Sequence, residues 1–169
     1  MIIINLGKVL LHGVIAGILA GLILTAIISI FSLVPILNIF TIVFLPFAWL
    51  LVTVVTPALV LHSYCNSLDK GDGVALGAVT GLTLAVVFGI TMSIATIIVT
   101  GINIGIQGRT EANVVDTGLA ALGFLFYIFI GFIGAIPSTI VGGISGWFFE
   151  NRWRIEKVEV VHKNKNEVN

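Results

Sequence analysis

The chain lacks charged side chains over most of its length. No Asp, Glu, Lys or Arg occurs in residues 9–68, 73–108 or 117–149. A soluble domain carries roughly 25% charged residues, whereas this chain has 9% charged and 58% hydrophobic residues. Uncharged stretches of this length exclude a soluble globular protein and indicate an integral membrane protein whose surface is solvated by lipid.

The chain contains a single cysteine, Cys65, so it cannot form an intramolecular disulfide. Ionisable side chains are missing from the centre of every uncharged stretch. Proton relays and ion-coupled transporters use such side chains inside the bilayer, so the sequence disfavours both. The glycines lack the Lys and Ser/Thr context of a phosphate-binding loop, and nothing indicates contact with nucleic acid.

The uncharged stretches predict an all-α fold, a bundle of four transmembrane helices in a domain at residues 1–150. About 20 helical residues cross about 30 Å of hydrocarbon, so the first stretch is long enough for two crossings. Ser32, Pro35 and Asn38 interrupt it, and proline disfavours helix at the residue before it. The predicted spans lie near residues 10–31, 40–61, 73–100 and 119–149.

The basic residues are divided unequally between the two predicted faces of the membrane. With four crossings, the N-terminus, the loop near residues 62–72 and the C-terminal tail share one face. Seven of the 8 Lys and Arg residues lie there, and Arg109 lies opposite. Cytoplasmic segments are enriched in Lys and Arg, so we expect both termini in the cytoplasm of a cell-membrane protein. Lys8 and the following apolar run resemble a signal peptide, but the run continues to about Leu37, which predicts a retained first span.

A collar of aromatic and basic residues follows the fourth predicted span. Tryptophan and arginine favour the layer of lipid headgroups. Membrane anchoring is the simplest role of such a collar, and specific lipid recognition is the alternative. We predict a basic interfacial and disordered tail at residues 151–169. The lipid-interface residues are Trp147, Arg152, Trp153 and Arg154.

Small residues recur every fourth position within three of the predicted spans. In lipid, small side chains at i and i+4 let two helix backbones approach closely. Alternatively the same faces line a narrow path, with hydroxyls from Ser93, Thr96 and Thr100. We favour packing, because Ser and Thr in a span commonly bond a backbone carbonyl. The predicted helix-packing residues are Gly13, Gly17, Gly21, Gly73, Gly77, Gly81, Gly89, Gly134, Gly142 and Gly146.

The second predicted span is bulky almost all round, with Phe44, Phe47 and Trp49 among its side chains. We therefore expect it to face lipid more than its neighbours do. Pro46 and Pro57 remove backbone donors within it, and nearby hydroxyls or another helix must satisfy the carbonyls that are freed.

His12, His62 and Cys65 form a weak candidate for a metal site on the cytoplasmic side. Their side chains are ligand types that zinc accepts, and His62-x-x-Cys65 is a spacing that can reach one ion. A thiol nucleophile at Cys65 is a further alternative. Polar residues at helix ends are the favoured interpretation, since a second His or Cys pair is missing. We predict no cofactor.

The Gly-x-x-x-Gly runs, the Pro-interrupted first hairpin and the Gly142-Gly143-x-x-Gly146 segment resemble small glycine-rich four-span archaeal membrane proteins of unknown function. The resemblance covers roughly residues 7–150, is compositional and implies no reaction. The sequence favours a structural or accessory membrane protein without catalytic activity. Its expected partners are the bilayer and a second copy or another membrane protein. The alternative is a channel or facilitator for a small neutral solute along the third span.

Overall fold

The described part of the chain folds into four helices. The computed structural model describes residues 6–64, 71–106 and 114–167, with side chains for residues 7–34, 43–64, 71–106 and 115–153. The helices are α1 (Leu6–Ser32), α2 (Pro35–Tyr64), α3 (Asp72–Ile106) and α4 (Val114–Glu167). Each contains a segment long and apolar enough to cross a membrane. The predicted all-α fold with four membrane-spanning helices is confirmed, and the chain is an integral membrane protein.

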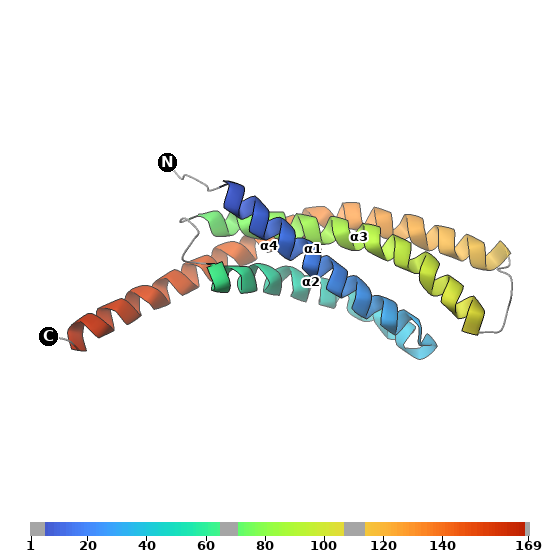
Figure 1. The fold of residues 1–169 in the computed structure, drawn as a ribbon, viewed down its shortest axis with the longest axis horizontal. Coiled ribbons are helices and arrows are strands. Elements are labelled where there is room, and N and C mark those ends of the chain that lie inside the picture. Colours follow the sequence, from blue (N-terminus) through green and yellow to red (C-terminus); the bar gives the residue numbers. More distant parts are fainter. Residues whose placement is uncertain (1–5, 65–70, 107–113, 168–169) are drawn as a thin grey trace.

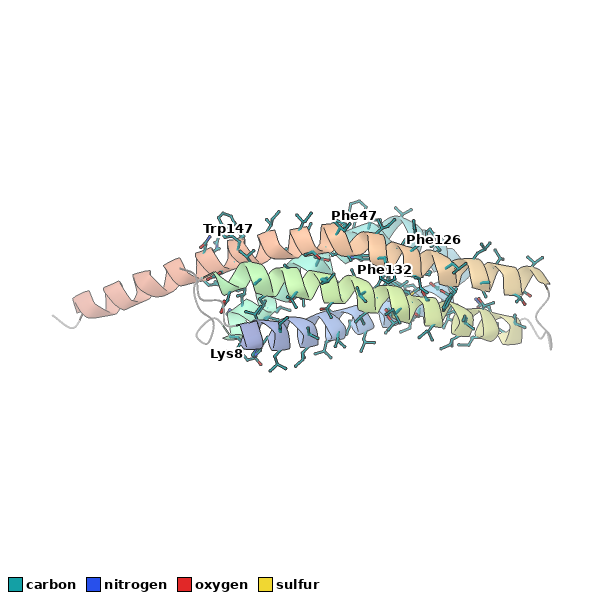
Figure 2. All side chains as sticks on the ribbon, turned by 90° about the horizontal axis from the view of Figure 1, so that it is seen from above. Lys8, Phe47, Phe126, Phe132 and Trp147 are labelled. Atoms are coloured by element: carbon teal, nitrogen blue, oxygen red, sulfur yellow. The ribbon has the colours of Figure 1, made fainter. Side chains whose placement is uncertain are left out.

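α3 is the central helix of the bundle. Figure 2 shows α3 between α4 and α1, with α2 behind them. Its side chains Leu84, Ala85 and Phe88 are each 0% exposed. α3 packs along α4 and α1, while α2 makes smaller contacts with the other three helices. In Figure 1 the α3–α4 pair extends past the turn between α1 and α2, and α4 projects from the opposite end.

The main apolar core surrounds Phe88. The Phe88 ring meets Trp49 of α2 edge-on, with 4.9 Å between ring centroids, and Tyr127 of α4 at 6.4 Å. Trp49 is only 9% exposed, so this bulky side chain of the second span faces the core. The reason lies on α4, where Gly134 has no side chain and leaves room for the indole. The other members of this core are Ala20, Leu24, Ile28, Leu84, Ala85, Met92 and Ala135.

The turn between α1 and α2 is closed by backbone hydrogen bonds. The N–H of Leu33 donates to the carbonyl of Ile30, and that of Val34 to Phe31, both at 3.2 Å. Pro35 then begins α2, at the first helical position, where a missing N–H costs little. The break in the first uncharged stretch therefore lies where the sequence predicts it.

The end of α4 differs from the prediction. All four predicted spans lie inside observed helices, but α4 continues to Glu167 where the sequence predicts a disordered tail. Residues 151–167 contain no Gly or Pro and are rich in Glu, Lys and Arg, which have high helix propensity. The polar residues after 150 end the apolar segment of α4, but the helix continues through them.

Candidate functional site

Glycines bring the backbone of α3 against that of α4. A Cβ atom added to Gly77 would overlap the carbonyl oxygen of Gly142. One added to Gly81 would overlap the carbonyl oxygen of Ser138. Because these neighbours are backbone atoms, they cannot move aside as a flexible side chain would. The two helices are therefore held at a distance that only glycine allows at these positions.

The other predicted glycines also lie at helix contacts. On α1 they receive side chains of α3: Gly13, Gly17 and Gly21 face Val79, Thr83 and Val87, respectively. The remaining contacts of the predicted glycines are Gly89 with Gly131, Gly134 with the Trp49 ring, and Gly73 with Gly146. In each case an added Cβ would lie 3.0 Å or less from a neighbouring atom. The structure thus places all the predicted packing glycines between helices.

The hydroxyl groups on the C-terminal half of α3 are bonded to backbone carbonyls. Thr96 and Thr100 each donate to the carbonyl four residues earlier, at 2.9 and 2.8 Å. The Ser93 hydroxyl lies 2.7 Å from the carbonyl of Gly89 and 3.0 Å from that of Phe124 on α4. Ser93 is 1% exposed. Thr96 and Thr100 thus bond within their own helix, and Ser93 also bonds to α4.

A buried carboxylate closes the end of the bundle where α1 begins. Glu150 of α4 is 4% exposed. Its Oε1 accepts a hydrogen bond from the N–H of Gly71 at 2.7 Å, and its Oε2 from that of Gly73 at 3.0 Å. Gly71 has a φ of 102°, a left-handed conformation that favours glycine. The carboxylate satisfies free amides at the N-terminus of α3 and complements the helix dipole there.

Glu150 is not among the residues predicted from the sequence, although a signal is present. It lies four residues after Gly146 and eight after Gly142, so it continues the stripe of small residues that faces α3. A carboxylate in register with a packing stripe points at the neighbouring helix. Glu150 also comes directly after an uncharged run, where a charged residue usually lies at the membrane surface. The sequence therefore suggests an ordinary interfacial residue, and its alignment with the small-residue stripe is easily overlooked.

The two histidines of the weak metal candidate each pack against a different aromatic ring. The ring of His12 packs on Tyr64 with 4.3 Å between centroids, and that of His62 on Trp153 at 5.3 Å. Cys65 lies outside the described residues. Among the residues that the structure describes, no three His, Cys, Asp or Glu side chains gather where they could hold a metal. The two histidines therefore belong to the aromatic contacts at this end of the bundle.

The predicted lipid-interface residues have different surroundings. Trp147 is 55% exposed, and Figure 2 shows it near the point where α4 leaves the bundle. Arg152 is also exposed. Trp153 is half-buried, and its ring lies 5.3 Å from that of Phe149. The side chain of Arg154 lies outside the described ones. Of the collar side chains that the structure describes, Trp147 and Arg152 are the exposed ones.

Polar contacts join α2 to α4. Trp49 Nε1 donates to Ser138 Oγ at 2.7 Å, and Ser145 Oγ donates to the carbonyl of Val54 at 2.8 Å. Val54 lies three residues before Pro57, and a proline inside a helix disturbs the carbonyls of the preceding turn. A hydroxyl from α4 therefore bonds to α2 beside its internal proline.

Several hollows open along α4. One of about 240 Å³ lies between α2 and α4 around Trp49 and Pro137. A second of about 370 Å³ lies around Ser145 and Trp147. A third, about 770 Å³, follows α4 from Leu119 to Phe132. Their walls are almost wholly apolar and they open outwards. In a membrane the medium outside them is lipid.

No family model, curated protein or solved structure matches the chain. The resemblance to glycine-rich archaeal membrane proteins therefore stays a prediction. Helix contacts, buried polar groups and lipid-facing hollows are the features that bear on function.

Proposed function

We propose that the protein is a structural or accessory component of the membrane, without catalytic activity, which acts through its helix faces. The observation that carries this proposal is the backbone contact of α3 with α4 at Gly77 and Gly81. Because the backbones of α3 and α4 touch there, this half of α3 leaves no space for a solute path between the two helices. Nearby hydroxyls support the same conclusion, because they already bond to carbonyls: Thr80, for example, donates to Leu76 at 2.8 Å.

The partners that suit such a protein are the bilayer and another membrane helix, from a second copy or from a different protein. Gly101 and Gly105 of α3 have no described atom within 4 Å of an added Cβ. They are four residues apart near the end of α3 that extends past the α1–α2 turn (Figure 1). Small residues at this spacing permit close helix pairing, so we place association through remaining glycines there.

A location in the cell membrane with both termini in the cytoplasm is part of the same proposal. The beginning of α1 and the end of α4 lie at the same end of the bundle (Figure 1). Lys8 and Arg152 belong to that end, and Arg109 belongs to the opposite connection. The excess of cations on one side supports the cytoplasmic assignment.

A facilitator for a small neutral solute is the second candidate. Buried polar side chains inside the bundle favour it, namely Thr80, Ser93 and Ser138. A facilitator needs such groups along a continuous hydrated path. Their hydrogen bonds to helix carbonyls and to Trp49 favour packing instead.

Reconstituted vesicles distinguish the two candidates. We expect the permeability to water and to urea, measured by stopped-flow light scattering, to equal that of protein-free vesicles. A protein-dependent flux that Thr96→Val reduces would overturn the accessory proposal and support the facilitator.

Gly81→Leu tests the packing contact itself. Because its side chain would meet the backbone of α4, we expect a loss of at least about 1–3 kcal/mol in the free energy of unfolding. Gly101→Leu is the matched control on the same helix, where the described neighbours leave open space. Equal losses for both variants, measured by unfolding in mixed micelles, would show that the contact has no special role.

A further inference from the structure

The C-terminal part of α3 lies beyond the end of α1. The hydroxyl oxygens of Thr91 on α3 and Thr25 on α1 are 2.6 Å apart, and the Ser29 hydroxyl lies 3.8 Å from Met92 Sδ. α1 ends three residues after Ser29, whereas α3 continues for 14 residues after Met92, to Ile106. The two helices run in the same direction (Figure 1). At about 1.5 Å per residue, α3 therefore extends about 16 Å past the end of α1.

The face of α3 that meets α1 continues into this extension. Val79, Thr83 and Val87 face the glycines of α1. Ile98 and Gly105 follow Val87 by 11 and 18 residues. At about 3.6 residues per turn, these separations return to the same side of the helix. Ile98 and Gly105 are exposed, so α1 covers this face near the start of α3 and leaves it open near the end.

The open face consists of isoleucine and glycine and carries no charge. Ile98, Ile102 and Ile106 are exposed. Gly101 and Gly105 lie between them in the sequence, and no described atom lies within 4 Å of a Cβ added to either. Bulky side chains therefore alternate with gaps along the face. The ridges of one such face fit the gaps of a second one.

This extension lies outside the hydrocarbon layer of the membrane. α1 contains 27 residues, about 40 Å of helix, and Lys8 keeps its first turn at the membrane surface. At a tilt of about 40°, the upper end of the usual range, a helix crosses roughly 30 Å of hydrocarbon within about 39 Å of its length. The hydrocarbon therefore ends no further along the bundle than α1 does. Acyl chains solvate an exposed isoleucine well and water does not, so an apolar occupant stabilises the face.

A second copy of the chain has the properties that this occupant needs. The occupant must be apolar and uncharged, and it must extend to the same height above the hydrocarbon. An identical chain in the same orientation meets these conditions by symmetry. The exposed face from Ile90 to Ile106 is about 24 Å long and about 10 Å wide, roughly 240 Å² per copy. Stable complexes in water bury about 800 Å² per partner, so this association is reversible and depends on the confinement of both copies to one membrane.

We propose that the exposed face of α3 around Ile102 binds the same face of a second copy and forms a reversible, symmetric dimer. The isoleucines of each copy enter the gaps at Gly101 and Gly105 of the other, so the two helix backbones approach closely. The inference rests on the proposed accessory function, for which it names the partner. A solute flux would overturn the accessory function and leave the dimer intact, whereas a monomer would overturn the dimer alone.

Förster resonance energy transfer in phosphatidylcholine vesicles tests the dimer. Donor and acceptor dyes are attached to the single cysteine, Cys65, of the full-length protein. After subtraction of the transfer that random proximity produces, we expect the signal to rise with the protein-to-lipid ratio and to fit an equilibrium of two copies. Gly105→Leu fills a gap and should weaken association about tenfold or more.

Gly118→Leu is the matched control for this variant. Gly118 of α4 is also exposed, and an added Cβ there meets no described atom within 4 Å. Because both glycines have open space around them, neither leucine should disturb the fold. Gly118→Leu should leave the association unchanged, since this residue lies outside the proposed contact.

Disulfide formation locates the contact. In a Cys65→Ser background, Ile102→Cys should form a cross-linked dimer when vesicles are oxidised with copper phenanthroline, because the symmetry axis brings the two copies of this residue together. Leu122→Cys is the control on α4, where the side chain is also exposed. It should remain monomeric.

Three outcomes would overturn the dimer. The first is energy transfer that never exceeds random proximity, which would leave lipid or a different protein as the occupant. The second is equal weakening by Gly105→Leu and Gly118→Leu. The third is cross-linking of Ile102→Cys that is no faster than that of Leu122→Cys, which would indicate chance collisions. If Gly105→Leu does not fold, as judged by circular dichroism, Ile98→Ala removes a ridge instead and should also weaken association.

Discussion

Glu150 shows how one side chain ties together two distant segments of the chain. Its carboxylate accepts hydrogen bonds from the amides of Gly71 and Gly73. A residue at the end of the apolar part of α4 therefore holds the N-terminus of α3 in place. Hydrogen bonds to a charged group contribute about 1.5–3 kcal/mol, and a shielded position strengthens them. At 4% exposure, water competes little for this carboxylate.

Glu150→Gln is expected to lower the free energy of unfolding by about 1–3 kcal/mol. The amide keeps the size of the side chain, but it loses the charge and presents an NH₂ group to one of the two backbone donors. Hydrogen exchange at Gly71 and Gly73 should accelerate with it. Lys8→Gln, at an exposed position near the same end, should leave both quantities unchanged. Unaltered exchange at the two glycines would contradict the role of the carboxylate.

Among the helices, α2 and α4 are embedded least. In their most apolar windows only 11% of residues are buried, against 33% for α1 and α3. The sequence predicts that the second span faces lipid more than its neighbours do. This holds against α1 and α3, whereas α4 is as exposed as α2. Between α2 and α4, the polar contacts at Trp49 and Ser145 compensate for limited apolar packing.

A double-mutant cycle of Trp49→Phe and Ser138→Ala measures one of these contacts. We expect a coupling free energy of about 0.5–2 kcal/mol, the range found for hydrogen bonds between membrane helices. Thr139→Ala supplies the control cycle, because the Thr139 hydroxyl donates to Ala135 of its own helix at 2.6 Å. Coupling with Thr139 as large as that with Ser138, in unfolding measured in mixed micelles, would rule out a specific bond.

At the scale of the molecule, the described helices form two hairpins of unequal length. α3 contains 35 residues, about 50 Å of helix, whereas the hydrocarbon layer is about 30 Å thick. To remain inside that layer α3 would need a tilt of about 55°, beyond the usual range of 0–40°. Part of the α3–α4 pair therefore projects from the hydrocarbon, in agreement with its extension past the α1–α2 turn in Figure 1.

The proposed topology predicts the labelling pattern of single cysteines in a Cys65→Ser background. A membrane-impermeant maleimide should label Lys8→Cys and Lys163→Cys only from the cytoplasmic side, because an even number of spans returns the chain to the same face. Arg109→Cys should be labelled only from outside. Labelling of the two terminal cysteines from opposite sides, in intact cells and in inverted vesicles, would refute the topology.

The sequence by itself determined the class of protein, the number of spans and the faces that carry glycine. Hydropathy and charge can be read directly along the chain, because an uncharged apolar stretch of about 20 residues is enough to predict a membrane span. The i+4 spacing also assigns Gly77, Gly81 and Gly142 to single helix faces before any partner is known.

Tertiary structure alone decided what each face meets. Trp49 turns inward because Gly134 lies opposite, and Glu150 is buried because the amides of α3 begin beside it. The hollow next to Trp147 lies where Ser145 of α4 bonds to Val54 of α2. Each of these outcomes depends on contact between two helices whose residues are far apart in the sequence. The periodicity of one helix does not say which residues of another helix it will meet.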